Sequence, residues 1–379
     1  MPDLIQIIIC FLVALSISLY CVPIIVRVDN ALKLFDKPNE RSSSQKAIPT
    51  LGGIAIFFSF VFASTIGMFG YDMPELIFIL AATLLIFFIG LKDDLVNLSP
   101  NKKLLAEIIA AMIIIFPAQT RFTDLHGLFG ISQIGVIPSV LLTAFVIVVI
   151  INSFNLTDGI DGLASSLTMM IGSILGTWFF ISSHLEYAIL SFSLVGATAG
   201  FFYYNVFGKR NKIFMGDTGS LVIGAIIAIL IIRFNEFNID QTQPFAVQSV
   251  PAISFGILAY PLLDVVRVIL IRVLQRKSPF AADKNHLHHR LLTLGFSHNK
   301  STFTIVGINI LFILAIFALH EIGMLRLIFY ILFAGSFLFM IPAFIIRKRN
   351  LIKKDDPVQR LLVPRITAEK IIAKDNQSR

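Results

Sequence analysis

The chain has 379 residues, of which 56% are hydrophobic and only 14% are charged, and its formal net charge is +8. Soluble domains carry about 25% charged residues, so this composition excludes an ordinary soluble domain and indicates a polytopic membrane protein. The positive charge requires no nucleic acid as a partner, because its distribution between loops explains it. The two cysteines lie in the first apolar segment and predict no disulfide framework.

Apolar stretches long enough to cross a bilayer follow one another along the chain. A stretch of roughly 17–25 apolar residues spans the membrane as a helix, because lipid leaves backbone polar groups no partners outside the helix. Eleven are found, at residues 4–26, 50–69, 75–91, 104–118, 136–151, 163–182, 187–207, 215–232, 248–271, 303–320 and 324–346. The fourth is short and contains Glu107, so ten spans are the alternative. We therefore expect an all-α membrane domain over 1–346 and a basic tail over 347–379.

Lysine and arginine are distributed unevenly between the loops. One alternating set of loops, together with the C-terminal tail, holds 27 of these residues, whereas the opposite set holds 3. The positive-inside rule places the richer set in the cytoplasm. The sequence thus predicts a cytoplasmic C-terminus, an N-terminus on the other side, and a cytoplasmic face that holds most of the unusual polar residues.

The first two cytoplasmic loops carry a turn signal and a pair of acids. "IPTLGG" marks a turn that enters the second helix. "GLKDDLVNLSPNKKLLAE" places Asp93 and Asp94 at the end of the third helix, with Lys103 at the start of the fourth. Adjacent carboxylates at a membrane surface suit a general base or a metal-linked acid. The alternative is an ordinary helix end in solvent.

The third cytoplasmic loop, "INSFNLTDGIDGLASS", contains no lysine or arginine. Asn152 and Asn155 are three residues apart, as are Asp158 and Asp161, so each pair shares a face if the segment is helical. Gly159 allows a ligand to approach the backbone closely. Uncompensated acids at a membrane mouth indicate cation binding or proton transfer, and carboxylate and amide oxygens favour Mg²⁺ over Zn²⁺.

The fourth cytoplasmic loop, "GKRNKIFMGDTGSL", places Asp217 at the start of the eighth helix. Free N–H groups there attract anions, and the carboxylate offers a hard oxygen ligand. The loop lacks the GxxxxGK[ST] pattern, which excludes a P-loop. Helix capping by Asp217 or Thr218 is the alternative interpretation.

The fifth cytoplasmic loop contains a histidine cluster in "DKNHLHHR", namely His286, His288, His289 and the adjacent Arg290. Clustered histidines suggest zinc, but no cysteine is present, and we favour recognition of an anion or a sugar over a metal. We expect no bound zinc. A merely basic surface loop is the third possibility.

Two further features accompany this loop. Asp264 and Arg267 are three residues apart in the ninth helix, and we expect an ion pair that stabilises a bend near Pro261. His298 has no partner in the sequence pattern and is interpreted as structural.

Together, "DDLVNL…KK", "NSFNLTDGIDGL", "FMGDTGS" and "SPFAADKNHLHHRLLTLGF" resemble the polyprenyl-phosphate N-acetylhexosamine-1-phosphate transferases of glycosyltransferase family 4. The resemblance extends over nearly the whole chain. It is closest to the WecA/TagO branch and more distant to MraY, whose consecutive histidines differ from "HLHHR" here.

The resemblance implies a reaction, its partners and a location. A polyprenyl phosphate, here undecaprenyl phosphate, attacks the β-phosphorus of a UDP-amino sugar, most simply UDP-GlcNAc, and UMP leaves. Mg²⁺ is the implied cofactor, for which Mn²⁺ can substitute. The implied setting is the cytoplasmic (inner) membrane, where the enzyme starts a cell-envelope glycan such as O-antigen, and a homodimer is expected by analogy.

The resemblance also implies residue roles around the metal and the phosphates. Asp217 would ligate Mg²⁺ together with Asn155. Asp93 or Asp94 would deprotonate or position the lipid phosphate, and Lys103 would bind phosphate.

The remaining roles concern the nucleotide and the sugar. Asp161 and the backbone near Gly159 would recognise uracil, and Phe214 would stack on the base. Asp158 is assigned to the catalytic group and Asn152 to the substrate-binding group. The residues assigned to the sugar and diphosphate are His286, His288, His289 and Arg290.

Two alternatives to this function are retained. One is a MraY-like enzyme acting on UDP-MurNAc-pentapeptide. The other is a transporter, which would place acids at the bilayer midplane in repeated halves of the chain. The acids here lie at helix ends on one side and no internal repeat is found, so we favour the transferase.

Overall fold

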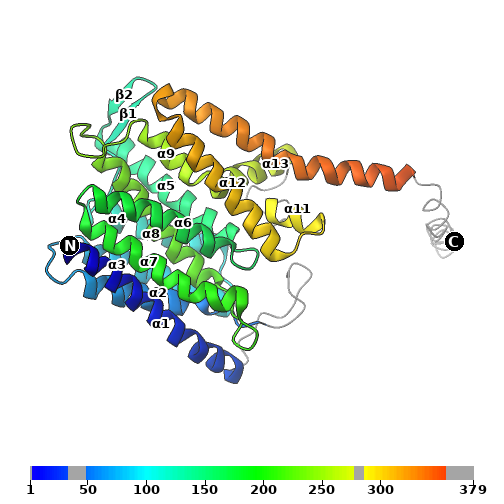
Figure 1. The fold of residues 1–379 in the computed structure, drawn as a ribbon, viewed down its shortest axis with the longest axis horizontal. Helices are drawn as coiled ribbons and strands as arrows, with labels where there is room; N and C mark the ends of the chain where they lie inside the picture. The colour runs from blue at the N-terminus through cyan, green and yellow to red at the C-terminus, as the bar shows by residue number, and fades with distance from the viewer. Residues whose placement is uncertain (1, 33–47, 277–285, 356–379) are drawn as a thin grey trace, which may run out of the picture.

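The computed structural model describes residues 2–32, 48–276 and 286–355, and within these ranges the chain is almost entirely helical (Figure 1). Eight of the described helices are long and apolar enough to cross a membrane. The long helices are α1 Pro2–Leu32, α3 Leu76–Val96, α5 Val136–Thr157, α6 Leu163–Ile181, α7 Leu185–Phe202, α8 Gly216–Phe237, α12 His298–Ala318 and α13 Met324–Asp355. The shorter helices are α2 Gly52–Gly67, α4 Pro100–Ile115, α9 Val250–Ile257, α10 Ala259–Leu274 and α11 Leu287–Thr293, with a π turn η1 at Tyr203–Phe207 and a 3-10 turn η2 at His320–Ile322.

Each of the eleven apolar stretches coincides with a helix or a pair of helices, which confirms the all-α membrane fold. The fourth stretch, whose status was open, forms α4 despite Glu107, and this carboxylate is buried in the bundle. At the other end of the chain, α13 continues through residue 346 to Asp355. The tail from residue 356 lies outside the described residues.

The ninth stretch is divided into α9 and α10, whereas one helix was expected. Pro261 lacks an N–H and its ring cannot be accommodated against the carbonyl of Ile257 in a continuous helix. Asn309 of α12, which is fully buried, repairs the break: its Oδ1 accepts from Tyr260 N at 2.9 Å and its Nδ2 donates to Ile257 O at 3.1 Å. The break is therefore tolerated inside the membrane domain because a neighbouring helix satisfies the freed backbone groups.

A β-hairpin formed by β1 Asp124–Leu128 and β2 Ile131–Gln133 was not predicted. The strands pair antiparallel, with Leu128 opposite Ile131. The two residues between them, Phe129 and Gly130, both have positive φ, of 54° and 78°, as a primed hairpin turn requires. The strands are too short for alternation of apolar and polar residues to reveal them.

Helix α8 forms the centre of the bundle, between α3 and α5. Every residue from Thr218 to Ile232 is buried, which explains why this helix is apolar on all sides. Its N-terminal turn approaches α2 so closely that a Cβ on Gly53 would overlap the backbone of Gly219, and a Cβ on Gly90 of α3 would overlap Thr218. Glycines thus allow three helix ends to meet at Asp217.

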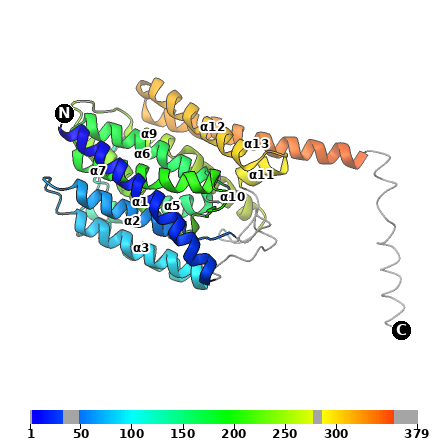
Figure 2. The ribbon, with the colours of Figure 1, turned by 60° about the horizontal axis from the view of Figure 1, so that its bottom comes forward.

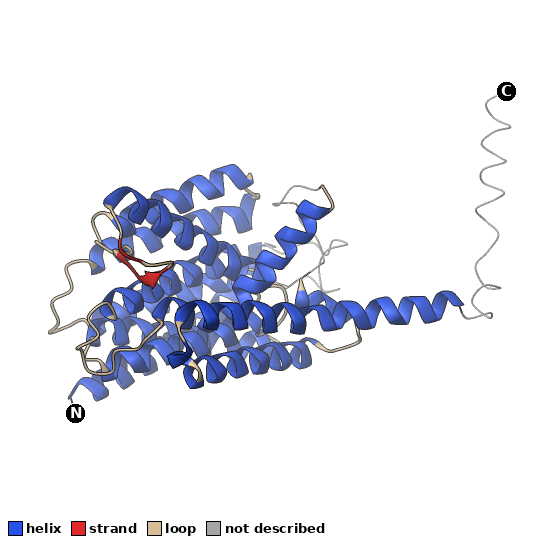
Figure 3. Cartoon of the chain, turned by 90° about the horizontal axis from the view of Figure 1, so that it is seen from above, coloured by secondary structure: helices blue, strands red, loops and turns tan. Residues whose placement is uncertain are grey.

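The described parts of the polar loops lie at one end of the bundle. In the first two views α11 and the far end of α13 lie at the end opposite the N-terminus (Figures 1 and 2). The hairpin lies at the N-terminal end (Figure 3). The ends of α3 and α5 and the starts of α4, α6 and α8 therefore meet at the end that is rich in lysine and arginine.

Candidate active site

A cavity of about 280 Å³ opens between the ends of α3, α5 and α8. It has acidic walls, with an aromatic ring and a glycine-containing turn at one side. The residues expected at the site that line it are Asp93, Asp94, Asn155, Asp158, Gly159, Asp161, Phe214 and Asp217. Residues from three loops that are far apart in sequence therefore line one cavity.

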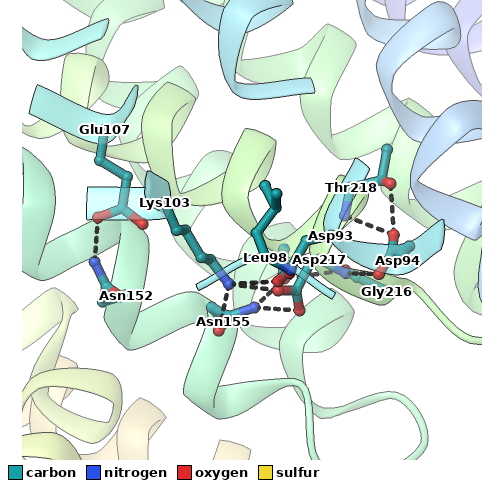
Figure 4. A network of polar contacts seen from close by, with 11 residues as sticks. Asp93, Asp94, Leu98, Lys103, Glu107, Asn152, Asn155, Gly216, Asp217 and Thr218 are labelled. Carbon is teal, nitrogen blue, oxygen red and sulfur yellow. Dashed lines mark hydrogen bonds and ion pairs between the residues drawn. The ribbon is translucent and has the colours of Figure 1, made fainter. Parts of the chain in front are cut away.

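Lys103 lies at the centre of the acidic half (Figure 4). Its Nζ donates to an oxygen of Asp217, and it lies 3.4 Å from both Asp93 Oδ2 and Asn155 Oδ1. Asn155 Nδ2 in turn donates to Asp217 Oδ1 at 2.7 Å and to Ser220 Oγ at 3.0 Å. One ammonium group therefore bridges oxygens contributed by α3, α5 and α8.

The turn between α3 and α4 explains the position of Lys103. Asn97 ends α3 with a positive φ of 52°, and the backbone N–H of Leu98 donates to Asp93. Pro100 then occupies the first position of α4, where no N–H is required. Lys103, one turn into α4, consequently faces back over the carboxylate of Asp93.

The structure distinguishes the two adjacent acids of the second loop. Asp94 caps α8: its Oδ1 accepts from Asp217 N at 2.7 Å, and its Oδ2 accepts from Thr218 N at 2.9 Å and from the Thr218 hydroxyl. The α8 cap thus comes from another helix, and not from Asp217 or Thr218 as one interpretation held. Asp93 and Asp217 carry the oxygens that face Lys103, so Asp94 has the character of a positioning residue.

The turn after α5 contributes Asp161, which is held from two other elements. Lys212 Nζ donates to Asp161 Oδ2 at 2.5 Å, and His298 Nδ1 lies 3.5 Å from the same oxygen. Thr302 of α12 donates to the Asp161 carbonyl at 2.8 Å. Although burial by itself would raise the pKa of Asp161, His298 and Lys212 together lower it, so the group is ionised at neutral pH. His298 therefore belongs to the site, whereas its isolated place in the sequence had indicated only a structural role.

Asn205 joins the two loops that form the side of the cavity lined by Asp161 and Phe214, and sequence reasoning missed it. Its Oδ1 accepts from Gly162 N at 2.7 Å and its Nδ2 donates to Ile213 O at 2.8 Å. The residue is buried in the π turn η1 and lines the cavity. A π turn at the end of a helix is a common mark of a functional site, but its sequence, "YYNVF", carries no signal for it.

Asp158 is the acid with the most unusual environment in this turn. Burial, reinforced by the nearby carboxylates of Asp217, Asp94 and Asp161, raises the pKa of Asp158 to about 8. It is therefore largely protonated at neutral pH in this state of the site. A neutral carboxyl can donate a hydrogen bond into the cavity, which the ionised carboxylate of Asp161 cannot.

The histidine segment is arranged differently from the acidic cluster. His286 is 4% exposed, and its Nδ1 lies 2.9 Å from Asp264 Oδ2. Asp264 also accepts from Arg267 at 2.7 Å, which confirms that ion pair, and from the backbone of Leu287 at 3.0 Å. Asp264 therefore anchors the start of α11, a role that the sequence pattern did not reveal.

His288 lies against the cavity turn. It is 1% exposed, its Nδ1 is 3.4 Å from the hydroxyl of Tyr260, and a Cβ on Gly159 would overlap its ring. Burial, with the charge of His289 close by, lowers the pKa of His288 to about 3, so the ring is neutral. Glycine at position 159 thus permits close packing against a histidine, in addition to any approach by a ligand.

The remaining members of the segment, His289 and Arg290, are half-buried, and Asp283 lies outside the described residues. Among the described residues no group of three His, Cys, Asp or Glu side chains is arranged to hold a metal ion. The contacts of His286 and His288 are with protein groups. Direct binding of the sugar diphosphate by this segment stays a prediction, carried best by His289 and Arg290.

Asn152 does not line the cavity. Its Nδ2 donates to Glu107 Oε2 of α4 and to Val148 O at 2.9 Å. The two asparagines of α5 share a helix face as their spacing indicated, but Asn155 meets the acidic cluster and Asn152 meets a buried acid one turn away (Figure 4). The assigned contact of Asn152 with substrate is therefore not supported by its position.

The oxygens around Lys103 suit a magnesium ion. Mg²⁺ takes oxygen ligands, keeps several waters and commonly uses only one or two carboxylates. Asp217, Asp93 and Asn155 offer such oxygens around a position that already attracts a cation, the ammonium of Lys103. The donor set therefore fits Mg²⁺ and contains none of the sulfur or imidazole groups that zinc prefers.

Comparison with known proteins agrees with this geometry. The model of the family described as "Glycosyl transferase family 4" matches residues 76–235, which include the acidic cluster. A relative from Bacillus subtilis (strain 168), named "Probable undecaprenyl-phosphate N-acetylglucosaminyl 1-phosphate transferase", is 31% identical over 82% of this chain and 84% of its own length. The Escherichia coli (strain K12) "Undecaprenyl-phosphate alpha-N-acetylglucosaminyl 1-phosphate transferase" is 29% identical over 73% of each chain. With this extent of similarity and the cavity described above, the chain belongs to glycosyl transferase family 4.

Proposed function

We propose that the protein transfers N-acetylglucosamine-1-phosphate from UDP-GlcNAc to undecaprenyl phosphate, giving undecaprenyl-diphospho-GlcNAc and UMP. The observation that carries this proposal is one cavity that joins a cation-attracting cluster of oxygens, around Lys103, to a second half lined by Asp161 and Phe214. The first half suits phosphates with a divalent cation, and the second suits a planar base. The names of the relatives support the same chemistry.

The reaction balances as a phosphoryl transfer. An oxygen of the lipid phosphate forms a bond to the β-phosphorus of UDP-GlcNAc, and the bond from that phosphorus to the bridging oxygen breaks. The bridging oxygen leaves with UMP and carries the electron pair. Nucleophile and electrophile are both anionic, so the site must reduce their repulsion and hold them in line.

The residues of the cavity have distinct tasks in this scheme. Phe214 stacks on uracil and the turn at Gly159 and Asp161 recognises its edge, while Lys103 meets the phosphates. Asp93 positions the lipid phosphate, which is largely ionised at neutral pH and needs no strong base. When bound by Asp217 and Asn155, Mg²⁺ would neutralise the diphosphate and polarise its oxygens.

The chain is a multi-pass membrane protein. We propose that it lies in the inner membrane and that its active site is on the cytoplasmic side. The distribution of 27 lysines and arginines against 3 supports this orientation. After residue 349, a reporter that functions only in the cytoplasm should be active. Before residue 2, a reporter that functions only on the opposite side of the membrane should be active. The reverse pattern would overturn both the orientation and the cytoplasmic site.

The decisive experiment measures release of UMP by the purified protein. With undecaprenyl phosphate and Mg²⁺ we expect turnover of UDP-GlcNAc, no turnover of UDP-MurNAc-pentapeptide, and loss of activity with EDTA that Mg²⁺ or Mn²⁺ restores. Turnover of the pentapeptide substrate alone would favour the MraY-like alternative. Absence of UMP release with any UDP-amino sugar would remove the transferase assignment.

A further inference from the structure

Glu107 is a buried acid that the scheme above does not use. It is the one acidic residue of α4, and only 1% of it is exposed. Its Oε2 accepts from Asn152, whereas its Oε1 is buried and has no hydrogen-bond partner in the described structure. A buried carboxylate oxygen without a partner is costly, and an acid within a membrane helix is a functional suspect.

The position of Glu107 relates it to Lys103. The two residues are four apart on α4 and therefore share a face of the helix, within reach of each other. That face meets α5, where Asn155 contacts Lys103 and Asn152 contacts Glu107. In Figure 4, the side chain of Lys103 lies between the Glu107–Asn152 pair and the carboxylates of Asp93 and Asp217.

The present position of Lys103 competes with a divalent cation. Its ammonium contacts Asp217, Asp93 and Asn155, which offer the oxygens that Mg²⁺ would take. Mg²⁺ binds its ligands at about 2.0–2.1 Å, and an ammonium bonded to the same oxygens would repel it strongly in a partly buried site. Lys103 must therefore withdraw from these oxygens when the cation binds, and a buried ammonium requires another anion.

We propose that Glu107 is this second anion, a positioning residue that accepts the ammonium of Lys103 when a divalent cation enters the oxygen cluster. The partnerless Oε1 of Glu107 is the acceptor, and Asn152 holds the carboxylate in place through Oε2. In the absence of substrate the lysine then has two anchored positions on one helix face, and it meets the phosphates only when substrate binds. This inference rests on the proposed function, because it requires a cation at Asp217.

The test measures cation binding without substrates, by electron paramagnetic resonance titration of the purified protein with Mn²⁺. Glu107→Gln keeps the shape and an oxygen that can accept from Asn152, but it removes the charge. We expect this variant to bind Mn²⁺ about 10-fold more weakly than the wild type, and Glu107→Asp, which keeps the charge, to retain most of the affinity.

A second background separates the lysine from a general effect of charge. In Lys103→Met, no ammonium must be relocated, so adding Glu107→Gln should change the affinity for Mn²⁺ less than about 2-fold. If Glu107→Gln lowered the affinity for Mn²⁺ equally in both backgrounds, Glu107 would act only through the long-range electrostatic effect of its charge. This result would overturn the inference. Glu236→Gln is the matched control. Glu236 accepts hydrogen bonds from Thr123 at the other end of the bundle, and removal of its charge should leave Mn²⁺ binding unchanged.

The outcomes also distinguish this inference from the proposed function. If the wild type binds Mn²⁺ and releases UMP but Glu107→Gln binds Mn²⁺ equally well, only the role of Glu107 falls. If the wild type binds no Mn²⁺ and releases no UMP, the proposed function falls together with it.

Discussion

The acidic cluster and the histidine segment both gather polar residues, but these residues make different kinds of contact. Asp93 and Asp217 line a cavity, and the cation that contacts them is the ammonium of Lys103. His286 and His288 are at most 4% exposed, and their ring nitrogens face Asp264 and Tyr260. The acidic cluster therefore presents its polar groups to a cavity, whereas the histidine segment uses them mainly to hold α11 in place.

The largest effect on activity is expected when the carboxylate of Asp217 is removed. Asp217→Ala should reduce UMP release at least about 10³-fold, because loss of a metal that clamps the diphosphate removes several kcal/mol of transition-state stabilisation. Its melting temperature should remain close to that of the wild type. Asp240→Ala, at an exposed acid in the loop after α8, should change neither quantity. Mg²⁺-dependent turnover near the wild-type level in Asp217→Ala would exclude this residue from the metal site.

Asp264 should show the opposite balance between activity and stability. Asp264→Asn breaks the buried contacts with His286 and Arg267, and loss of one partner of such a pair destabilises proteins by roughly 3–5 kcal/mol. We expect a clear fall in the melting temperature in detergent. Asp72→Asn, at an exposed position outside the bundle core, serves as the control. An unchanged melting temperature combined with lost activity would place Asp264 among the substrate-binding residues and contradict the comparison.

Arg290 tests whether the histidine segment also contacts substrate. Charge-assisted contacts to phosphate are worth roughly 1.5–3 kcal/mol, so Arg290→Ala should lower kcat/KM for UDP-GlcNAc by about 10- to 150-fold. The dependence on Mg²⁺ should be unaltered, and Lys300→Ala, at an exposed cation of α12, should have little effect. One equivalent of zinc by elemental analysis, lost on mutation of any of the three histidines, would instead establish a metal site there.

The smallest expected effect concerns Asp158 and pH. Its folded-state pKa of about 8 lies above the ordinary value of 3.8, so between these values the folded protein binds more protons at this site than the unfolded chain. The contribution of Asp158 to stability therefore falls as pH rises from about 4 to 8. Asp158→Asn should melt higher than the wild type by a few degrees at pH 8 and by less at pH 5. A difference that does not grow with pH would show that Asp158 is ionised throughout.

The helices themselves were largely predictable because the membrane imposes a single, strong rule. Eleven apolar stretches correspond to the observed helices, and α8 begins at Gly216, the first glycine of "MGDTGS". Prediction failed where the determining partner lies elsewhere in the chain. The break before Tyr260 depends on Asn309 of α12. The hairpin at residues 124–133 was missed for a different reason, because its strands are too short to show an alternation of apolar and polar residues.

The sequence by itself determined the class of protein, the end of the bundle that carries the site, and most of the residues in the cavity. Length of apolar runs, loop charge and hard oxygen ligands are local properties that can be read from neighbouring residues. Only the tertiary structure decided that Asp94 caps α8 while Asp93 faces Lys103, and that His298 and Lys212 hold Asp161. It also decided that Glu107 is buried beside Asn152. The physical reason is that the partner of a buried polar group is set by how helices pack, and residues up to 185 positions apart in the described chain share a single hydrogen bond.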